Sequence, residues 1–421
     1  MVGVVRGRRC WGMPLVAVLL LSAACDGAGS GDTTGSSSSA ATGASAATGA
    51  SAAAVRTADV ALPEGDEPVV VTAWGADLLV GSRAPAGSAS RPRLTVLSAG
   101  GGSREVAVTP VSPTAFSAKW LVAAPRGATV DLVGGAPAGA HSNTRWSTWR
   151  GNASGVRELP QPFATFGGWG AGALVSLVQT PSEPVIVGSW ESGGAGLDIA
   201  LWHPQGERWV RASSAGTALA STAKALVSAR GATADRDGVL VVGSVTLLGD
   251  GVLQRAAVWQ APGPDGPWTR TDLAGAGSLG EAHAASCDAG GRCTVVGVVD
   301  GRLRGWVLAS DGSVSALALP ALAVGEHDLL TAPLLRGEEA TVILASAGTL
   351  QVLTVGGAEA GSSGGSTGGS GGPSGGGRDG IRQQTGPPAR AVRSTARTAS
   401  GDYVVLEDPA GKPRLVRLPA H

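Results

Sequence analysis

Leu240-Val241-Val242-Gly243 is the clearest of five short aliphatic runs that end in glycine along this chain. The glycines of successive runs are 53 to 55 residues apart. A fixed period of this size is typical of proteins built from repeated supersecondary units, so we expect an array of such units. The other four runs are Leu78-Leu79-Val80-Gly81, Asp131-Leu132-Val133-Gly134, Val185-Ile186-Val187-Gly188 and Thr294-Val295-Val296-Gly297.

The best-formed repeat, residues 225–275, contains four short strand patterns separated by clusters of Gly, Pro and Asp. Its second strand is apolar at consecutive positions, which is typical of a strand covered on both faces. The glycine that ends this strand fits a bulge or a close approach of a neighbouring backbone. Four antiparallel strands per repeat predict a propeller blade. The four patterns lie at 225–229, 238–244, 255–259 and 268–273.

Weaker copies extend the repeat to the C-terminus, and we count seven. The last copy, residues 389–419, has three strands, and residues 55–62 resemble the missing fourth strand. An N-terminal strand that completes the last blade would leave no open sheet edge. We therefore predict an all-β, seven-bladed β-propeller over residues 55–421, closed by an N-terminal strand. Six or eight blades, and a linker role for residues 55–62, are the alternatives. A Gly/Ser-rich stretch at about 358–379 is expected to be a disordered insertion.

The first residues have the pattern of an export signal. Arg6, Arg8 and Arg9 precede a short apolar stretch at 14–21, which is too short for a comfortable transmembrane helix. Ser22-Ala23-Ala24-Cys25 follows and resembles the lipobox of bacterial lipoproteins. That resemblance implies a signal peptide at 1–24, a lipid anchor on Cys25 and a place on the outer side of the cell membrane. Ordinary cleavage with an unmodified Cys25 is the alternative.

Two further features of this region complete the expected layout. Residues 25–54 are almost entirely small and polar, so they should form a disordered tether. Arg8-Arg9 resembles a twin-arginine export signal without its fuller motif, so export by the Sec route is favoured.

The cysteines support an oxidising location. Cys10 leaves with the signal peptide and Cys25 is assigned to the lipid, which leaves Cys287 and Cys293. They flank a tight Asp-Ala-Gly-Gly turn between two apolar strands, so we predict a disulfide across a hairpin. A zinc site is the alternative, but His283 is the single further ligand nearby.

Composition limits the possible partners. The 421 residues include 67 Gly, and 32 basic residues balance 32 acidic ones. A net charge of zero gives no field that attracts polyanions, so we expect no nucleic-acid partner, and membrane contact only through the lipid. We expect a monomer.

One repeat resembles a known family. Trp259, followed by the turn and strand at 265–270, is similar to a degenerate Asp-box, the hairpin motif of the sialidase superfamily. Asp265 and Asp311 match the motif aspartate, and Gln205 departs from it. In that family the motif ties a turn, so the resemblance implies a fold and no catalytic residue. Tyr403 is the single tyrosine and falls in a predicted interior strand, which argues against the sialidase active site.

Catalytic motifs are lacking in the sequence. There is no P-loop lysine and no His-Glu-x-x-His, and the five histidines are scattered. We expect no cofactor, no metal and no catalytic residue, and keep a sialidase-like or other polysaccharide-cleaving enzyme as the rival hypothesis.

The candidate ligand-binding residues come from loops that share one face of a propeller. Loops from strand four to the next strand one, and from strand two to strand three, lie on the face where ligands usually bind. Aromatic side chains with a few polar groups suit a protein or a glycan. We therefore predict a non-catalytic binding or scaffold protein of the bacterial cell envelope; the alternative is that these rings fill gaps between blades. The residues are Arg83, Trp120, His141, Phe163, Phe166, Trp169, Trp190 and Glu191.

Overall fold

The computed structural model describes residues 53–87, 89–139, 142–249, 251–275, 277–325, 328–356 and 380–419. All described residues belong to one compact unit, Ser51–His421. The predicted signal peptide, Cys25, most of the tether and the insertion at 358–379 lie outside the described residues. Ala53 and Ala54, expected to end the tether, form a short strand instead.

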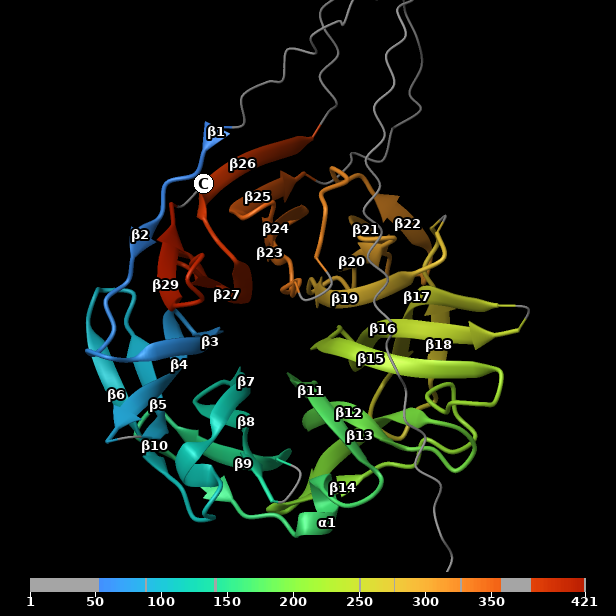
Figure 1. The fold of residues 1–421 in the computed structure, drawn as a ribbon, viewed down its shortest axis with the longest axis horizontal. Coiled ribbons are helices and arrows are strands. Elements are labelled where there is room, and N and C mark those ends of the chain that lie inside the picture. Colours follow the sequence, from blue (N-terminus) through green and yellow to red (C-terminus); the bar gives the residue numbers. More distant parts are fainter. Residues whose placement is uncertain are drawn as a thin grey trace, which may run out of the picture. The chain divides into compact units, whose positions relative to one another are not determined.

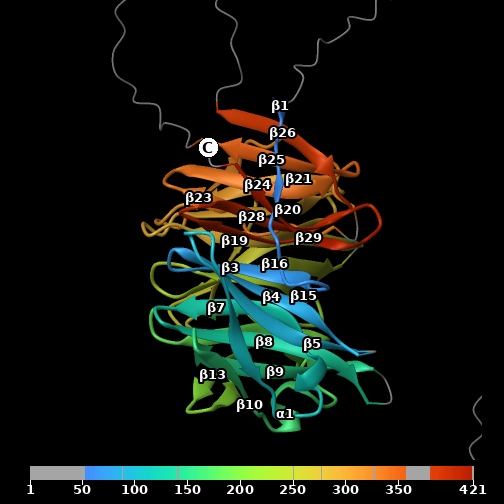
Figure 2. The ribbon, with the colours of Figure 1, turned by 90° about the vertical axis from the view of Figure 1, so that its left-hand side faces the viewer.

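This unit is a β-propeller. Six sheets surround a central opening, with their innermost strands toward the centre (Figure 1). In a side view, successive sheets follow one another around the ring (Figure 2). Three sheets are simple four-stranded antiparallel meanders. They are β11 (Ala171–Gln179), β12 (Pro184–Glu191), β13 (Leu197–Gln205) and β14 (Arg208–Arg211); β15 (Ala225–Ala234), β16 (Val239–Leu248), β17 (Val252–Ala261) and β18 (Thr269–Asp272); and β19 (Gly280–Cys287), β20 (Cys293–Val299), β21 (Arg302–Leu308) and β22 (Val314–Leu317).

The N-terminal segment adds one short strand to each of two further sheets. In one, β1 (Ala53–Ala54) pairs in parallel with β26. In the other, β2 (Ala58–Asp59) pairs antiparallel with β29, which confirms that an N-terminal strand completes the last sheet. The first sheet also contains β23 (Leu334–Arg336), β24 (Glu339–Ser346), β25 (Thr349–Val355) and β26 (Ile381–Pro388); the second contains β27 (Ala391–Thr398), β28 (Gly401–Glu407) and β29 (Pro413–Leu418).

The sixth sheet has eight strands, so the prediction of seven separate four-stranded sheets is not met. Five sheets are single blades, and the sixth runs β3-β4-β5-β6-β10-β9-β8-β7. Its centre is a parallel pairing of β6 with β10, through Gly155↔Ala107, Val156↔Val108 and Arg157↔Thr109. Two outer strands thus satisfy each other's free edges. The strands are β3 (Glu67–Trp74), β4 (Asp77–Ala86), β5 (Ala89–Leu97), β6 (Ser103–Thr109), β7 (Lys119–Arg126), β8 (Thr129–Ala138), β9 (Asn143–Asn152) and β10 (Gly155–Leu159).

The repeated glycines lie opposite bulges in the innermost strands. Gly243 in β16 pairs with Ala229, and the next pair is Val242 with Gly231, so Arg230 is the extra residue of the bulge. A Cβ on Gly243 would lie closer than 3.0 Å to the carbonyl oxygen of Ser228. The bulge brings the inner backbone so near that only glycine fits. The same pairing joins Gly134 to Trp120, Gly188 to Leu174 and Gly297 to Ala282, whereas Gly81 pairs with Val70 on the other side of the bulge in β3.

Tryptophans of the third strands fix the connections between sheets. Trp202, Trp259 and Trp306 are buried. Each indole N–H donates to a carbonyl in the segment that leads into the first strand of its own sheet. The acceptors are Thr165 at 2.9 Å, Ala218 at 2.9 Å and Ala274 at 2.7 Å, respectively. A buried indole thereby gains a partner for its single donor and packs its ring in the core.

Helix is a minor component of the described residues. It is confined there to a single 3-10 turn, η1 (Ala115–Ser117), and the four-residue α1 (Phe163–Phe166). Within the same part of the chain, no helix has the length and apolar character needed to cross a membrane.

The predicted disulfide is confirmed. Cys287, the last residue of β19, faces Cys293, the first residue of β20, across the hairpin, and the two sulfurs are bonded. Asp288 Oδ1 accepts hydrogen bonds from the backbone N–H groups of Gly290 and Arg292 in the turn between them. The bond therefore closes a hairpin whose turn is already ordered.

Replacing Cys287 and Cys293 together by Ser should lower the free energy of unfolding by about 2 kcal/mol, because the unfolded chain regains the entropy of this short loop. Urea unfolding with and without reductant measures the change. Reductant should destabilise the wild type and leave the double variant unchanged; an equal response of both proteins would contradict a stabilising role.

Candidate functional site

The predicted site residues that the structure describes lie near one face of the propeller, which we call the entry face because the innermost strand of each meander begins there. In an antiparallel meander the first and third strands begin, and the second and fourth strands end, at the same edge of the sheet. The connections between meanders and the hairpins between second and third strands therefore share this face, as the sequence analysis assumed.

Two of the predicted aromatic residues are core residues. Trp120 is 2% exposed, its indole N–H donates to the carbonyl of Arg93 at 2.9 Å, and its ring meets Trp149 edge-on. Phe166 is 6% exposed and packs against Trp202. Neither ring is available to a ligand, because both fill space between neighbouring strands. For these two residues the gap-filling alternative is correct.

Of two other predicted residues, Arg83 is held by its own sheet and His141 is not placed. Arg83 lies in the β4–β5 hairpin, where its guanidinium donates to Ser90 Oγ at 2.8 Å and pairs with Glu67. These contacts, to β3 and β5 on either side of β4, occupy much of its donor capacity within one sheet. His141 lies outside the described residues.

The remaining four residues, Phe163, Trp169, Trp190 and Glu191, lie around the start of β11, and we call them the aromatic surface. Trp169 is fully exposed, and Phe163 is 58% exposed. The residue after Trp169, Gly170, runs against Trp190: a Cβ there would lie 2.6 Å from the indole nitrogen. The backbone N–H of Glu191 donates to the carbonyl of Gly170 at 2.7 Å, which fixes Trp190 and Glu191 beside the segment that carries Trp169.

Two arginines that the sequence analysis missed complete this surface. The guanidinium carbon of Arg145, in β9, lies 4.5 Å from the centre of the Phe163 ring, and that of Arg211, at the end of β14, lies 4.4 Å from the Trp190 ring. Both are cation–π contacts. Partial burial lowers the pKa of Arg211, an effect that the charge of nearby Asp198 opposes. The sequence did not point to these arginines, because each contacts an aromatic ring from a different element of the fold.

A cavity of about 310 Å³ opens beside Phe163. Arg145, Trp146 and Phe163 line it together with Glu158, which is buried and accepts hydrogen bonds from the backbone of Val111 and Ser112. Glu158 is therefore used to hold the β6–β7 connection. The cavity therefore presents aromatic and guanidinium groups in its walls.

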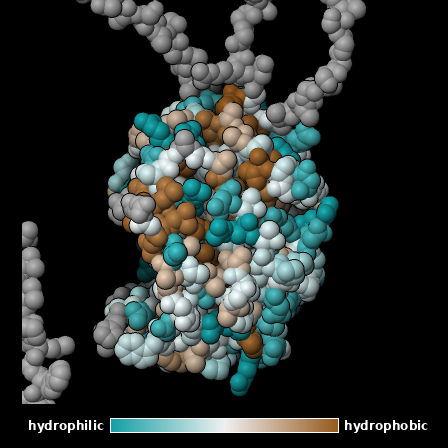
Figure 3. Space-filling model, turned by 90° about the vertical axis from the view of Figure 1, so that its right-hand side faces the viewer, coloured by the Kyte–Doolittle hydropathy of each residue, from teal (hydrophilic) through white to brown (hydrophobic). Residues whose placement is uncertain are grey.

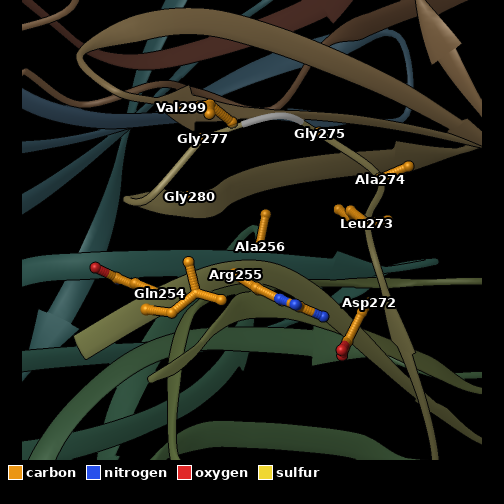
Figure 4. Close-up of a pocket in the computed structure, with 11 residues that line it drawn as sticks. Gln254, Arg255, Ala256, Asp272, Leu273, Ala274, Gly275, Gly277, Gly280 and Val299 are labelled. Atoms are coloured by element: carbon orange, nitrogen blue, oxygen red, sulfur yellow. The ribbon is translucent and has the colours of Figure 1, made fainter. Parts of the chain in front are cut away.

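Two more cavities lie where the β15–β18 and β19–β22 sheets meet. Figure 4 shows the smaller one, of about 290 Å³, in which Arg255 points toward Asp272 and small residues form the far wall. The larger, of about 650 Å³, shares Gln254 with it and contains Arg230, Glu281 and His283. Among the described residues no group of three or more His, Cys, Asp or Glu side chains is arranged to hold a metal ion.

Comparisons with known proteins bear on the fold alone. No family model and no curated protein matches the sequence. Among solved structures, the β-propeller domain of the Trilobed protease from Pyrococcus furiosus aligns with 84% of this chain and 96% of its own, at 8% identity and a TM-score of 0.48. Virginiamycin B lyase from Staphylococcus aureus aligns with 87% of this chain and 99% of its own, at 8% identity and a TM-score of 0.47.

An acylaminoacyl peptidase from Pyrococcus horikoshii aligns with 85% of this chain at 9% identity and a TM-score of 0.49. This chain spans about half of that enzyme, 51% of its length. At such low identities these similarities transfer no activity to this chain.

Two tryptophan substitutions should distinguish a tryptophan in the core from one on the aromatic surface by their effects on stability. Trp120→Ala leaves a cavity in the core and should lower the free energy of unfolding by about 3 to 5 kcal/mol. Trp169→Ala removes an exposed ring and should change it by less than about 0.5 kcal/mol. Chemical unfolding followed by circular dichroism measures both. A large loss from Trp169→Ala would mean that its ring packs against the protein.

Proposed function

We propose that this chain is a lipid-anchored, extracytoplasmic binding or scaffold protein of the bacterial cell envelope. Its aromatic surface would bind an envelope partner, either a protein or a glycan. The observation that carries the proposal is a fully exposed tryptophan, Trp169, beside two guanidinium–aromatic stacks. Exposed aromatic rings with adjacent arginines are typical of the residues that dominate binding energy at interfaces.

The rival hypothesis of a polysaccharide-cleaving enzyme is less well supported. Glycosidases generally need two carboxyl groups across the scissile bond, one of them protonated as the acid. Glu281, in the cavity of about 650 Å³, is the best candidate, but both of its oxygens accept contacts from neighbouring side chains. Burial alone would raise its pKa, yet hydrogen bonds from His283 and Arg230 outweigh burial and lower it to about 2. Such a carboxylate stays ionised and serves as an anchor.

We also propose a count of seven blades, with the eight-stranded sheet counted as two. Two observations support it: β3–β6 and β7–β10 are each complete antiparallel meanders, and each has a bulge opposite a repeated glycine. The relation to Asp-box repeats is likewise a proposal. In its support, Asp311 Oδ1 accepts a hydrogen bond from the backbone N–H of Ser313 at 2.9 Å, as a turn-tying aspartate should.

Anchoring can be tested on Cys25. Cys25→Ala should abolish incorporation of radiolabelled palmitate and release the protein from the membrane fraction, because the thiol that carries the lipid is gone. Equal labelling of the wild type and the variant would refute the lipid anchor and leave the aromatic surface untouched.

Binding can be tested by capture of envelope proteins and purified envelope glycans on the immobilised protein. Trp169→Ala combined with Trp190→Ala should lose the captured partner. Val252→Ala, which alters an exposed apolar side chain on another sheet, is the matched control and should retain it. Unchanged capture by the double variant would show that the aromatic surface is not the binding site.

A further inference from the structure

Six inner strands each contain a bulge with one extra residue, at an equivalent register in all except β3, where the bulge is displaced by one residue pair. A bulge re-aims a side chain away from the regular alternation of a strand. In β3, β7 and β11 the extra residue is aliphatic, whereas in β15, β19 and β27 it is basic. The residues are Val69, Leu121, Val175, Arg230, His283 and Arg393.

Two of these basic residues meet at one carboxylate. Arg230 Nε lies 2.8 Å, and His283 Nε2 lies 3.3 Å, from Oε2 of Glu281. The other oxygen, Oε1, accepts hydrogen bonds from Ser244 Oγ at 3.2 Å and Gln254 Nε2 at 3.4 Å. Glu281 is therefore saturated with donors and holds Arg230 in place. A positioned arginine with free donors is well suited to bind a carboxylate.

Among the described residues, Arg230 contacts Glu281 through Nε and its two terminal nitrogens have no partner. Its side chain is 57% exposed. It lines the cavity of about 650 Å³, a size in the usual range for small-molecule sites. The unused guanidinium edge therefore faces a space that can hold a ligand.

The same cavity contains an open acceptor. Asp328 lines it and uses Oδ2 to accept the backbone N–H of Gly325 at 2.7 Å, while Oδ1 has no hydrogen bond among the described residues. Free guanidinium donors and a free carboxylate oxygen in one cavity are complementary to a ligand that carries both charges.

The cavity also has an apolar wall. Leu279 and Leu329 line it and are 57% and 48% exposed, and Val298, Val324 and Leu330 contribute further apolar surface. Figure 3 shows the edge of the ring seen from the right of Figure 1, where brown hydrophobic residues gather among teal polar ones. Exposed leucines beside a cavity gain free energy when a ligand covers them.

We propose that this cavity binds a zwitterionic ligand with an apolar side chain, such as a short peptide with free termini. Arg230 receives the carboxylate, Asp328 receives the ammonium group, and Leu279 and Leu329 contact the apolar side chain. This site is separate from the aromatic surface and does not depend on the partner proposed for it.

Titration calorimetry of the purified chain from residue 53 onward, which contains all described strands, with leucyl-leucine tests the proposal. The dipeptide should bind, and blocking either terminus, in acetyl-leucyl-leucine or leucyl-leucinamide, should weaken binding by about tenfold, the factor expected for the loss of one charge-assisted contact. Arg230→Gln and Asp328→Asn should each have the same effect. Moreover, Asp328→Asn should make the dipeptide and its acetylated form bind equally.

Matched controls distinguish the outcomes. Arg393→Gln changes the bulged arginine of β27, outside this cavity, and should leave binding unchanged, as should Trp169→Ala. Arg230→Lys retains the charge and should keep part of the affinity. It is the second variant to use if Arg230→Gln perturbs the fold. No binding of the dipeptide, or equal binding of a peptide blocked at both termini, would overturn the proposal. Loss of dipeptide binding in Trp169→Ala would place the ligand on the aromatic surface instead.

Discussion

The close approach of the repeated glycines Gly188, Gly243 and Gly297 to the bulge of the neighbouring inner strand is the contact on which this propeller depends. The bulge inserts one residue into the strand nearest the central opening and pushes its backbone toward the second strand. A side chain on Gly243 or Gly297 would meet a carbonyl oxygen of that backbone. The glycine therefore allows the bulge, and the bulge both curves the inner strand and turns one side chain out of register.

The sequence was enough to predict the repeat, its four strands and the covered second strand, because each depends on local patterns of apolar and turn residues. It also predicted closure by residues 55–62 and the disulfide of Cys287 with Cys293. The joining of two meanders through β6 and β10 could not be predicted, since parallel pairing of two outer strands depends on their distance in the folded ring. The pairing of β1 with β26 was missed because two alanines carry no strand signal.

Prediction of the site was less successful for a physical reason. The sequence around an aromatic residue in a loop does not show whether its ring fills the core or faces solvent. Trp120 and Phe166 fill the core, whereas Phe163 and Trp169 are exposed. Trp190 is half-buried: it packs edge-on against the core residue Trp202 and also contacts Arg211. Arg230 was not identified, and His283 was considered only as a possible zinc ligand, because an amino-acid pattern does not reveal which residue a bulge will turn out of the strand. The bulges thus connect the architecture to the chemistry, since they place basic side chains against Glu281.

Alanine substitution at individual glycines, with the free energy of unfolding as the readout, tests this account most directly. Gly243→Ala and Gly188→Ala place a Cβ within 3.0 Å of a backbone oxygen and should each cost more than about 2 kcal/mol. Gly134→Ala, whose Cβ would lie 3.2 Å from the oxygen of Lys119, should cost less. Gly263, with no atom within 4 Å, is the control and should change by less than about 0.5 kcal/mol. Equal losses at all four positions would contradict the account.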